Sequence, residues 1–224
     1  MSASTYHYCA TSVEAVRAEP DHGAERVTEA MLWDELVIDD EAADWLRVTL
    51  ASQAGYGGWI PRSAVAEGSR PEGTEAVVLR PCVPLSPHGE EPGTCAGVLW
   101  MGSAVWVDGS GGKESLSRLR GPDGREYSVP SEFLSELSVA RAEPPVARAA
   151  SAAQNALSLI GVPYLWGGMT FRGVDCSGLI QVAYRAVGVV LPRDADLQYD
   201  AGKPVSAGDL RAGDTAYLAS DDRI

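Results

Sequence analysis

The stretch Tyr164-Leu-Trp-Gly-Gly-Met-Thr-Phe-Arg-Gly-Val-Asp-Cys-Ser-Gly-Leu-Ile-Gln181 places one cysteine where a nucleophile would lie. Cys176 follows a glycine-rich loop and opens an apolar pattern of helical period. Asp175 or Ser177 can cap this helix. A thiol in the first turn lies at the positive end of the helix dipole, which favours the thiolate. The stretch therefore predicts a reactive cysteine at a helix N-terminus.

A cysteine nucleophile also needs a base, which is usually a histidine. The chain has three histidines, His7, His22 and His88, and none of them follows Cys176. The sequence therefore predicts a nucleophile without a base from the same part of the chain.

Four ordered segments resemble the NlpC/P60 family of cysteine peptidases, which cleave cell-wall peptides. They are residues 163–168, 175–179, 191–194 and 210–218. The resemblance covers roughly residues 146–224 and implies an incomplete papain-like domain with Cys176 as nucleophile. In the family, the histidine lies on the strand just after the segment that matches Gly213-Asp214. The resemblance thus implies a base that is missing rather than substituted.

Composition excludes several classes of protein. The 224 residues are 45% hydrophobic, which predicts a packed interior, and carry a net charge of −13, which argues against nucleic-acid binding. No apolar run is long enough to cross a membrane. No secretory signal is visible, which favours a cytoplasmic location and leaves a trimmed periplasmic or secreted chain open. The cysteine spacings match no zinc pattern, so we expect neither metal nor cofactor.

The N-terminal part reads as short strands separated by turns. Expected strands are 27–31, 36–38, 45–50 and 58–60. Their motifs resemble the bacterial SH3-like (SH3b) barrel, which carries a Gly-Glu turn, a Trp-x-x-Val strand and a Gly-Tyr-x-Gly-Trp hairpin. Here Asp34 stands at the glycine position of the first motif. The resemblance implies a first barrel over residues 1–68.

A second, weaker barrel is expected over residues 70–141. Its candidate strands are 76–79, 98–100, 104–107 and 125–129, and the Pro/Gly-rich stretch 81–97 is expected to be a loop. Residues 142–145 mark a linker, and a helix is expected over 146–160. The predicted fold class is therefore α+β, with two small SH3-like barrels followed by the first part of an NlpC/P60 domain at 146–224.

This layout resembles the γ-D-glutamyl-L-diamino acid endopeptidases, which cut murein peptides that have a free N-terminal L-Ala. The resemblance implies that Asp194 binds the ammonium group of the peptide. Tyr56 matches the tyrosine that the first barrel contributes, and Glu25 is a weaker match to its glutamate. Whether diaminopimelate or lysine is preferred stays open.

The remaining site residues surround the cysteine. Tyr164 is expected to face Cys176 and to assist at the oxyanion. Asp175 and Ser177 flank the nucleophile and are assigned with it to the substrate site. Ala195 replaces a serine of the family pattern, which removes one hydrogen bond to the ligand. Trp166 is expected to pack beneath the loop.

Three hypotheses follow for the missing base. The chain is a peptidase without its C-terminal part, a split enzyme completed by a second polypeptide, or a non-catalytic module that binds murein peptide. In the family, the sheet that covers the cysteine helix comes mostly after the Gly-Asp segment. Without that sheet, we expect apolar helix faces without a covering layer and an unpaired strand edge at 215–218.

Overall fold

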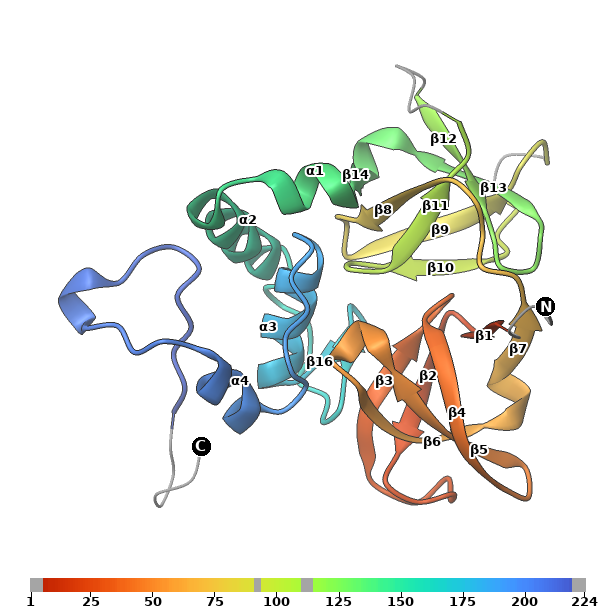
Figure 1. Cartoon of the computed structure of the whole chain (residues 1–224), viewed down its shortest axis with the longest axis horizontal. Helices are drawn as coiled ribbons and strands as arrows, with labels where there is room; N and C mark the ends of the chain where they lie inside the picture. Colours follow the sequence, from red (N-terminus) through yellow and green to blue (C-terminus); the bar gives the residue numbers. More distant parts are fainter. Residues whose placement is uncertain (1–5, 91–93, 110–114, 219–224) are drawn as a thin grey trace, which may run out of the picture.

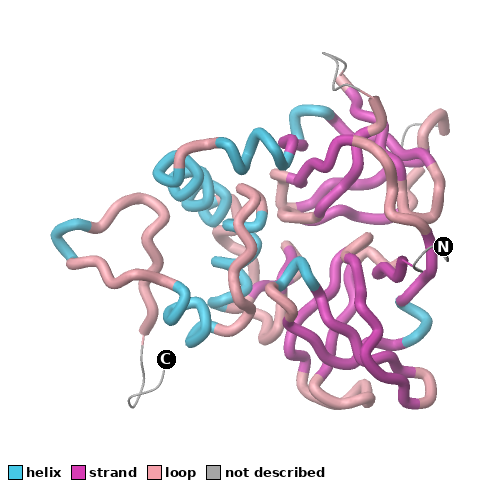
Figure 2. Tube along the Cα trace, viewed as in Figure 1, coloured by secondary structure: helices cyan, strands magenta, loops and turns pink. Residues whose placement is uncertain are grey.

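The computed structural model describes residues 6–90, 94–109 and 115–218. Two antiparallel sheets lie one above the other on one side of the molecule, and the helices lie on the other side (Figures 1 and 2). We call residues 6–68 the first sheet region, 74–136 the second sheet region and 137–218 the C-terminal lobe. The fold is therefore mixed, with strands first and helices last.

The first sheet has seven strands in the order β3-β2-β6-β5-β4-β1-β7. The four expected strands are confirmed, and three more pair with them. The strands are β1 (Tyr6–Cys9), β2 (Val13–Arg17), β3 (Arg26–Met31), β4 (Glu35–Ala42), β5 (Trp45–Leu50), β6 (Tyr56–Pro61) and β7 (Val65–Gly68). Strands β3 and β7 end the order without pairing to each other, so among the described residues the sheet is open.

Buried and exposed side chains alternate along the strands of this sheet, and the buried ones form its core. In β5, Leu46, Val48 and Leu50 are buried, whereas Arg47 between them is exposed. This period of two is what a half-buried strand requires. These side chains pack with Val16 and Ile60 from β2 and β6. A 3-10 turn at Ala51–Gln53 then leads into β6 and Tyr56.

The second sheet also has seven strands, in the order β10-β9-β13-β12-β11-β8-β14. The strands are β8 (Thr74–Val78), β9 (Cys82–Pro87), β10 (Gly97–Trp100), β11 (Ala104–Val107), β12 (Leu116–Arg120), β13 (Glu126–Pro130) and β14 (Leu134–Glu136). The prediction of a loop at 81–97 was wrong for 82–87. Val83 and Leu85 are buried in β9 and outweigh the two prolines of that strand.

The two sheets share one hydrophobic core. Tyr6, Tyr8 and Trp33 from the first sheet region pack against side chains of the second. The rings of Trp33 and Tyr127 lie 5.3 Å apart between centroids. The sheets are therefore fixed against each other by buried apolar contacts rather than joined only by the chain.

The C-terminal lobe contains four α-helices, a short 3-10 helix at Ala207–Asp209 and a two-stranded hairpin. These are α1 (Leu137–Ala142), α2 (Pro145–Leu157), β15 (Met169–Thr170), β16 (Gly173–Val174), α3 (Cys176–Arg185) and α4 (Ala195–Ala201). The expected helix at 146–160 is confirmed as α2, which begins at the tolerated first-turn proline. None of the helices in the described part of the chain is long and apolar enough to cross a membrane.

This lobe is docked on both sheets. Met31 and Trp100 pack with Leu159, Met169 and Val182 in a third buried cluster. Beside it, Arg185 at the end of α3 forms a buried ion pair with Asp34 at the start of β4. The aspartate that departs from the SH3b glycine pattern therefore has a structural partner in the C-terminal lobe.

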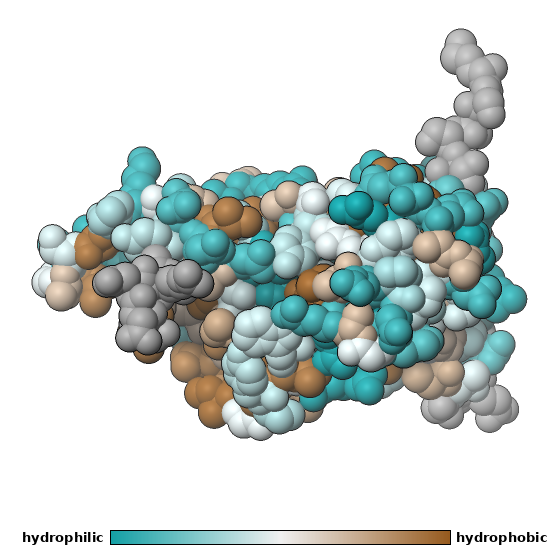
Figure 3. All heavy atoms as spheres, turned by 90° about the horizontal axis from the view of Figure 1, so that it is seen from below, coloured by the Kyte–Doolittle hydropathy of each residue, from teal (hydrophilic) through white to brown (hydrophobic). Residues whose placement is uncertain are grey.

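The last described segment does not form the expected strand edge. Residues 215–218 have no strand conformation, because no neighbouring strand in the described residues pairs with them. Large apolar side chains are exposed around this segment, and Figure 3 shows hydrophobic atoms at this end of the molecule. They include Leu197, Tyr199, Val205, Leu210 and Leu218.

Candidate active site

Cys176 is the first residue of α3 and its side chain lies in an exposed position. Asp175 caps the helix by accepting a hydrogen bond from the Gly178 amide at 2.7 Å. The thiol therefore lies in the first turn, where the helix dipole favours a negative charge. Structure and sequence agree on the helix and on its cap.

Asp175 is buried, and both of its carboxylate oxygens are bound by protein groups. Besides the Gly178 amide, it accepts from the Gly167 amide at 2.8 Å and from Arg193 Nη2 at 2.6 Å. A Cβ at Gly167 would lie 2.5 Å from the Arg26 carbonyl oxygen, and its φ is +73°, so glycine is required there. Asp175 thus holds the glycine loop and the helix start together beneath Cys176.

Ser177 is buried as well. Its hydroxyl accepts from Arg193 Nη1 at 2.8 Å, and its carbonyl accepts from Gln198 Nε2 at 3.0 Å. The predicted substrate-site residues Asp175 and Ser177 therefore face the protein interior. In this geometry their bound atoms hold the glycine loop and the start of α3 in place around Cys176.

Arg193 connects the cysteine helix to the first sheet region. Its guanidinium, one of the most buried large side chains, also donates from Nε to Thr28 Oγ1 at 2.9 Å. Thr28 in turn donates to Gln53 Oε1 at 2.6 Å. Gln53 belongs to the 3-10 turn that precedes Tyr56. One chain of hydrogen bonds thus runs from the base of α3 to the turn that positions Tyr56.

The structure brings Tyr56 and Asp194 together, although 138 residues of sequence separate them. Burial raises the pKa of Tyr56 to about 12, and the charge of Asp194 and a hydrogen bond to it act in the same direction. Burial also raises the pKa of Asp194, which the Tyr56 hydrogen bond opposes. Both side chains remain half-buried, so they are still open to a ligand.

Glu25 is exposed and accepts a hydrogen bond from Trp166 Nε1 at 2.8 Å. The prediction that Trp166 packs beneath the loop was wrong, since 61% of its surface is exposed. Its indole instead spans from the glycine loop to the first sheet region. The carboxylate of Glu25 also contributes to the raised pKa of Tyr56, which places the two side chains near each other.

Tyr164 and Ala195 are the remaining site residues that the sequence predicts. Tyr164 is 63% exposed, and the raised pKa of its hydroxyl, caused first by desolvation and then by the Cys176 thiol, indicates that the two side chains are neighbours. Ala195 is half-buried and directly follows Asp194 as the first residue of α4. It offers no hydroxyl at that position.

Sequence reasoning missed Glu29. This buried carboxylate accepts from the Met169 amide at 2.8 Å, and burial raises its pKa. It therefore joins β3 to the hairpin that precedes Cys176. The available signal was a charged residue inside the apolar run 27–31, where an ion or hydrogen-bond partner from elsewhere is required.

The three histidines all have partners within the sheet regions. His7 Nε2 lies 3.6 Å from Glu67, the His22 ring centroid lies 4.7 Å from that of Trp45, and His88 Nδ1 lies 2.8 Å from Ser128 Oγ. In the described ranges no group of three or more potential ligands gathers as a metal site. The arrangement around Cys176 thus offers a thiol, a phenol and a carboxylate.

We expect Cys176 to be the cysteine alkylated fastest by iodoacetamide at neutral pH. It is exposed at a helix N-terminus, whereas burial raises the pKa of Cys9 to about 12 and raises the pKa of Cys82 above its ordinary value. Peptide mapping over a time course measures all sites in one sample. Cys95, which is also exposed, is the internal control. Equal rates at Cys95 and Cys176 would contradict an activated thiol.

Comparisons with known proteins find relatives of this chain. Residues 161–224 match the NlpC/P60 family. A γ-D-glutamyl-L-lysine dipeptidyl-peptidase of Bacillus subtilis is 25% identical over 204 residues, which cover 87% of this chain and 64% of that protein. A probable endopeptidase of Corynebacterium glutamicum is 34% identical over 138 residues, which cover 58% of this chain and 66% of that protein. The chain thus spans less than two thirds of the length of these relatives.

A solved structure shares the fold. An NlpC/P60 family protein from Bacillus cereus superimposes with a TM-score of 0.77 at 19% identity, covering 94% of this chain and 81% of that one. This likeness extends through both sheets as well as the C-terminal lobe. The solved structure thus shows the fold, and the family match assigns residues 161–224 to the NlpC/P60 family.

Proposed function

We propose that this chain is a peptidase of the γ-D-glutamyl-L-diamino acid endopeptidase type, acting on murein peptides with a free N-terminal L-Ala. The observation that carries the proposal is the meeting of Tyr56 and Asp194 near the α3 N-terminus that bears Cys176. A half-buried carboxylate with a phenol beside it suits an ammonium group. Relatives named as γ-D-glutamyl-L-lysine dipeptidyl-peptidases support the substrate class.

The two sheets are best interpreted as SH3-like units, an assignment that belongs to the same proposal. It is supported by the Glu35, Trp45 and Gly-Tyr-Gly-Gly-Trp motifs of the first unit and by a strand set of the same size in the second. In this interpretation the first unit contributes Tyr56 and Glu25 to the site. The second unit supports the first through their shared core.

In the proposed reaction, the Cys176 thiolate attacks the γ-carbonyl carbon of D-Glu. The sulfur–carbon bond forms as the amide bond breaks, and the amine of the diamino acid leaves with a proton. Water then hydrolyses the thioester. Tyr164 and the backbone amide at Cys176 are the proposed donors to the oxyanion. Asp175, Ser177 and Arg193 act as positioning residues, because their polar atoms hold the helix start in place.

The proton transfers need a base and acid, and within the part of the chain that the structure describes no histidine is seen beside Cys176. A histidine performs both steps in this chemistry. We propose that it comes from a polypeptide segment outside these residues, either in the same chain or from a second chain. The exposed Leu197, Tyr199, Leu210 and Leu218 suit such a covering segment.

The 224-residue chain alone is therefore expected to hydrolyse L-Ala-γ-D-Glu-diaminopimelate at a rate near background. Adding the C-terminal segment of a family member, fused or as a separate peptide, should restore release of diaminopimelate. Chromatography of the products measures it. In the restored protein, Cys176→Ala should abolish release, whereas Cys95→Ala should leave it unchanged.

Two results would contradict this account. Release by the 224-residue chain that is lost in Cys176→Ala would show that a base is already present. If the completed protein bound L-Ala-γ-D-Glu-diaminopimelate but did not hydrolyse it, the alternative would be favoured. That alternative is a non-catalytic module that binds murein peptide. The alanine at position 195, which removes one hydrogen bond from the family pattern, is the sequence feature that favours that alternative.

A further inference from the structure

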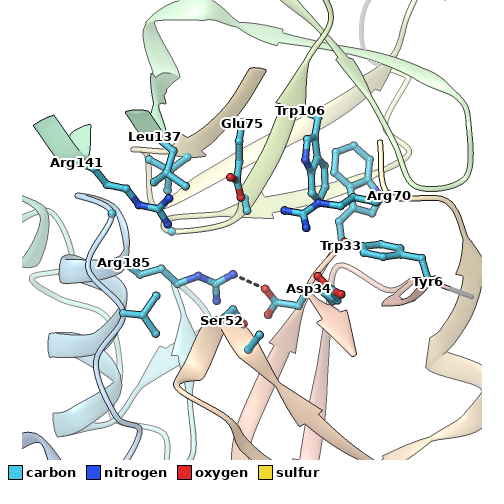
Figure 4. Close-up of a pocket in the computed structure, with 17 residues that line it drawn as sticks. Tyr6, Trp33, Asp34, Ser52, Arg70, Glu75, Trp106, Leu137, Arg141 and Arg185 are labelled. Atoms are coloured by element: carbon cyan, nitrogen blue, oxygen red, sulfur yellow. Dashed lines mark hydrogen bonds and ion pairs between the residues drawn. The ribbon is translucent and has the colours of Figure 1, made fainter. Parts of the chain in front are cut away.

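A cavity lies at the junction of all three parts of the molecule, away from Cys176. Its volume is about 350 Å³, at the small end of the range for ligand pockets. It is lined by the C-terminal end of α3, whereas Cys176 begins that helix, roughly 14 Å away along the axis. Figure 4 shows the first sheet region below, the second above and the helices at one side.

Two residues that line this cavity each carry a buried polar atom that has no hydrogen-bond partner in the described structure. The two atoms are Arg185 Nη1 and Ser52 Oγ. Arg185 is only 6% exposed, and its other terminal nitrogen is engaged by Asp34. Unpartnered buried donors are costly, so a group that accepts from both would be stabilised there. A carboxylate has the lone pairs to do so.

The lining of the cavity also carries charges of both signs. Arg70, Arg141, Glu35 and Glu75 line it, and none of them forms a salt bridge within the described residues. In Figure 4, Glu75 and Arg141 point toward the space above Arg185. A ligand with a single negative charge would leave the glutamates unmatched. A ligand with both an ammonium and a carboxylate matches both signs.

The remaining wall is apolar. Trp33, Trp106 and Leu137 are buried side chains that face the cavity, and they belong to three different segments. Such a wall accepts an apolar side chain and excludes water around it. The volume of the cavity, the charges that line it and its apolar wall therefore suit the same class of ligand, a small zwitterion with an apolar side chain.

We propose that this cavity binds a small zwitterion with an apolar side chain, of the size of an amino acid or dipeptide. Its carboxylate accepts from Arg185 Nη1 and Ser52 Oγ, its ammonium lies against Glu75, and its side chain packs on the two tryptophans. Because the ligand touches both sheets and α3, its binding stabilises the docked arrangement of the three parts.

Titration of the full 224-residue chain with L-leucine tests the site, followed by tryptophan fluorescence and the midpoint of thermal unfolding. Saturable binding and a raised midpoint are expected. Leucinamide and N-acetyl-L-leucine, each lacking one charge, should bind at least about tenfold more weakly, because each leaves a charged partner unmatched.

Two variants locate the binding. Ser52→Ala and Arg141→Gln should each weaken L-leucine binding several-fold, since the first removes a donor to the carboxylate of the ligand and the second removes a positive charge from the cavity lining. The matched controls Ser63→Ala and Arg47→Gln alter exposed residues outside the cavity and should bind as the parent does. Asp194→Asn should also bind as the parent does, which separates this cavity from the proposed active site.

Any of three outcomes overturns the proposal. The first is the absence of saturable L-leucine binding at millimolar concentration in a folded protein. The second is binding that Ser52→Ala and Arg141→Gln leave unchanged, and the third is binding that Asp194→Asn removes. Arg185→Met is avoided as the deciding variant because it also breaks the buried pair with Asp34.

Discussion

Replacing Arg193 by methionine is expected to lower the free energy of unfolding by about 3–5 kcal/mol. The guanidinium is buried, and its hydrogen bonds to Asp175, Ser177 and Thr28 would all be lost. The carboxylate of Asp175 would then remain buried without its cation, which accounts for most of the cost. Denaturant unfolding followed by tryptophan fluorescence measures the change.

A double variant identifies the cause. Asn at 175 still caps α3 but carries no charge, so Arg193→Met with Asp175→Asn should be more stable than Arg193→Met alone. Arg211→Met, an exposed arginine of the same lobe, is the control and should change stability by less than about 0.5 kcal/mol. A loss below about 1 kcal/mol for Arg193→Met would show that this pair does not hold the lobe in place.

Replacing Asp194 by asparagine is expected to weaken binding of the dipeptide L-Ala-γ-D-Glu by about 100-fold. The substitution keeps the shape and removes the charge that the ammonium group needs. Calorimetry on the 224-residue chain measures this without turnover. Asp196, two residues further along the chain, is exposed. Asp196→Asn is therefore the matched control, and this variant should bind the dipeptide nearly as the parent does.

The carboxylate of Asp194 also predicts how the affinity for the dipeptide depends on pH. Burial raises the pKa of Asp194, so the negative charge and the ligand affinity should be lost at a higher pH than for an ordinary aspartate as the solution is acidified. Tyr56→Phe removes the hydrogen bond that lowers this pKa, so the loss should move to a still higher pH. Affinity that is flat across this range in the parent would contradict ammonium binding by Asp194.

Local patterns were sufficient to predict the elements that carry the site. The helical period after Cys176, the capping aspartate and the first-turn proline of α2 depend on neighbours in sequence, and the structure has each of them. Motif matches also assigned Tyr56 and Asp194 to the substrate site, and in the structure a hydrogen bond joins these two side chains. Elements with strong local signals are the ones that sequence reasoning identifies best.

The contacts that dock the parts could not be predicted in the same way. Asp34 with Arg185, Glu29 with Met169 and Arg193 with Thr28 join residues more than 130 positions apart, and no spacing rule connects them. The role of β9 was missed because two prolines outweighed its alternating buried residues in the sequence. Trp166 was misplaced because its partner Glu25 lies in another part of the chain.

Affinity labelling with the chloromethyl ketone of L-Ala-γ-D-Glu tests most directly whether Cys176 is the nucleophile of a site that recognises a free N-terminus. The thiolate displaces chloride and forms a stable sulfur–carbon bond, so no base is needed for the readout. Intact mass and peptide mapping should show one adduct, at Cys176, formed much faster than with the N-acetylated reagent and slowed by Asp194→Asn. Labelling of Cys82 or Cys95 at the same rate, or equal rates with and without the N-acetyl group, would contradict the account.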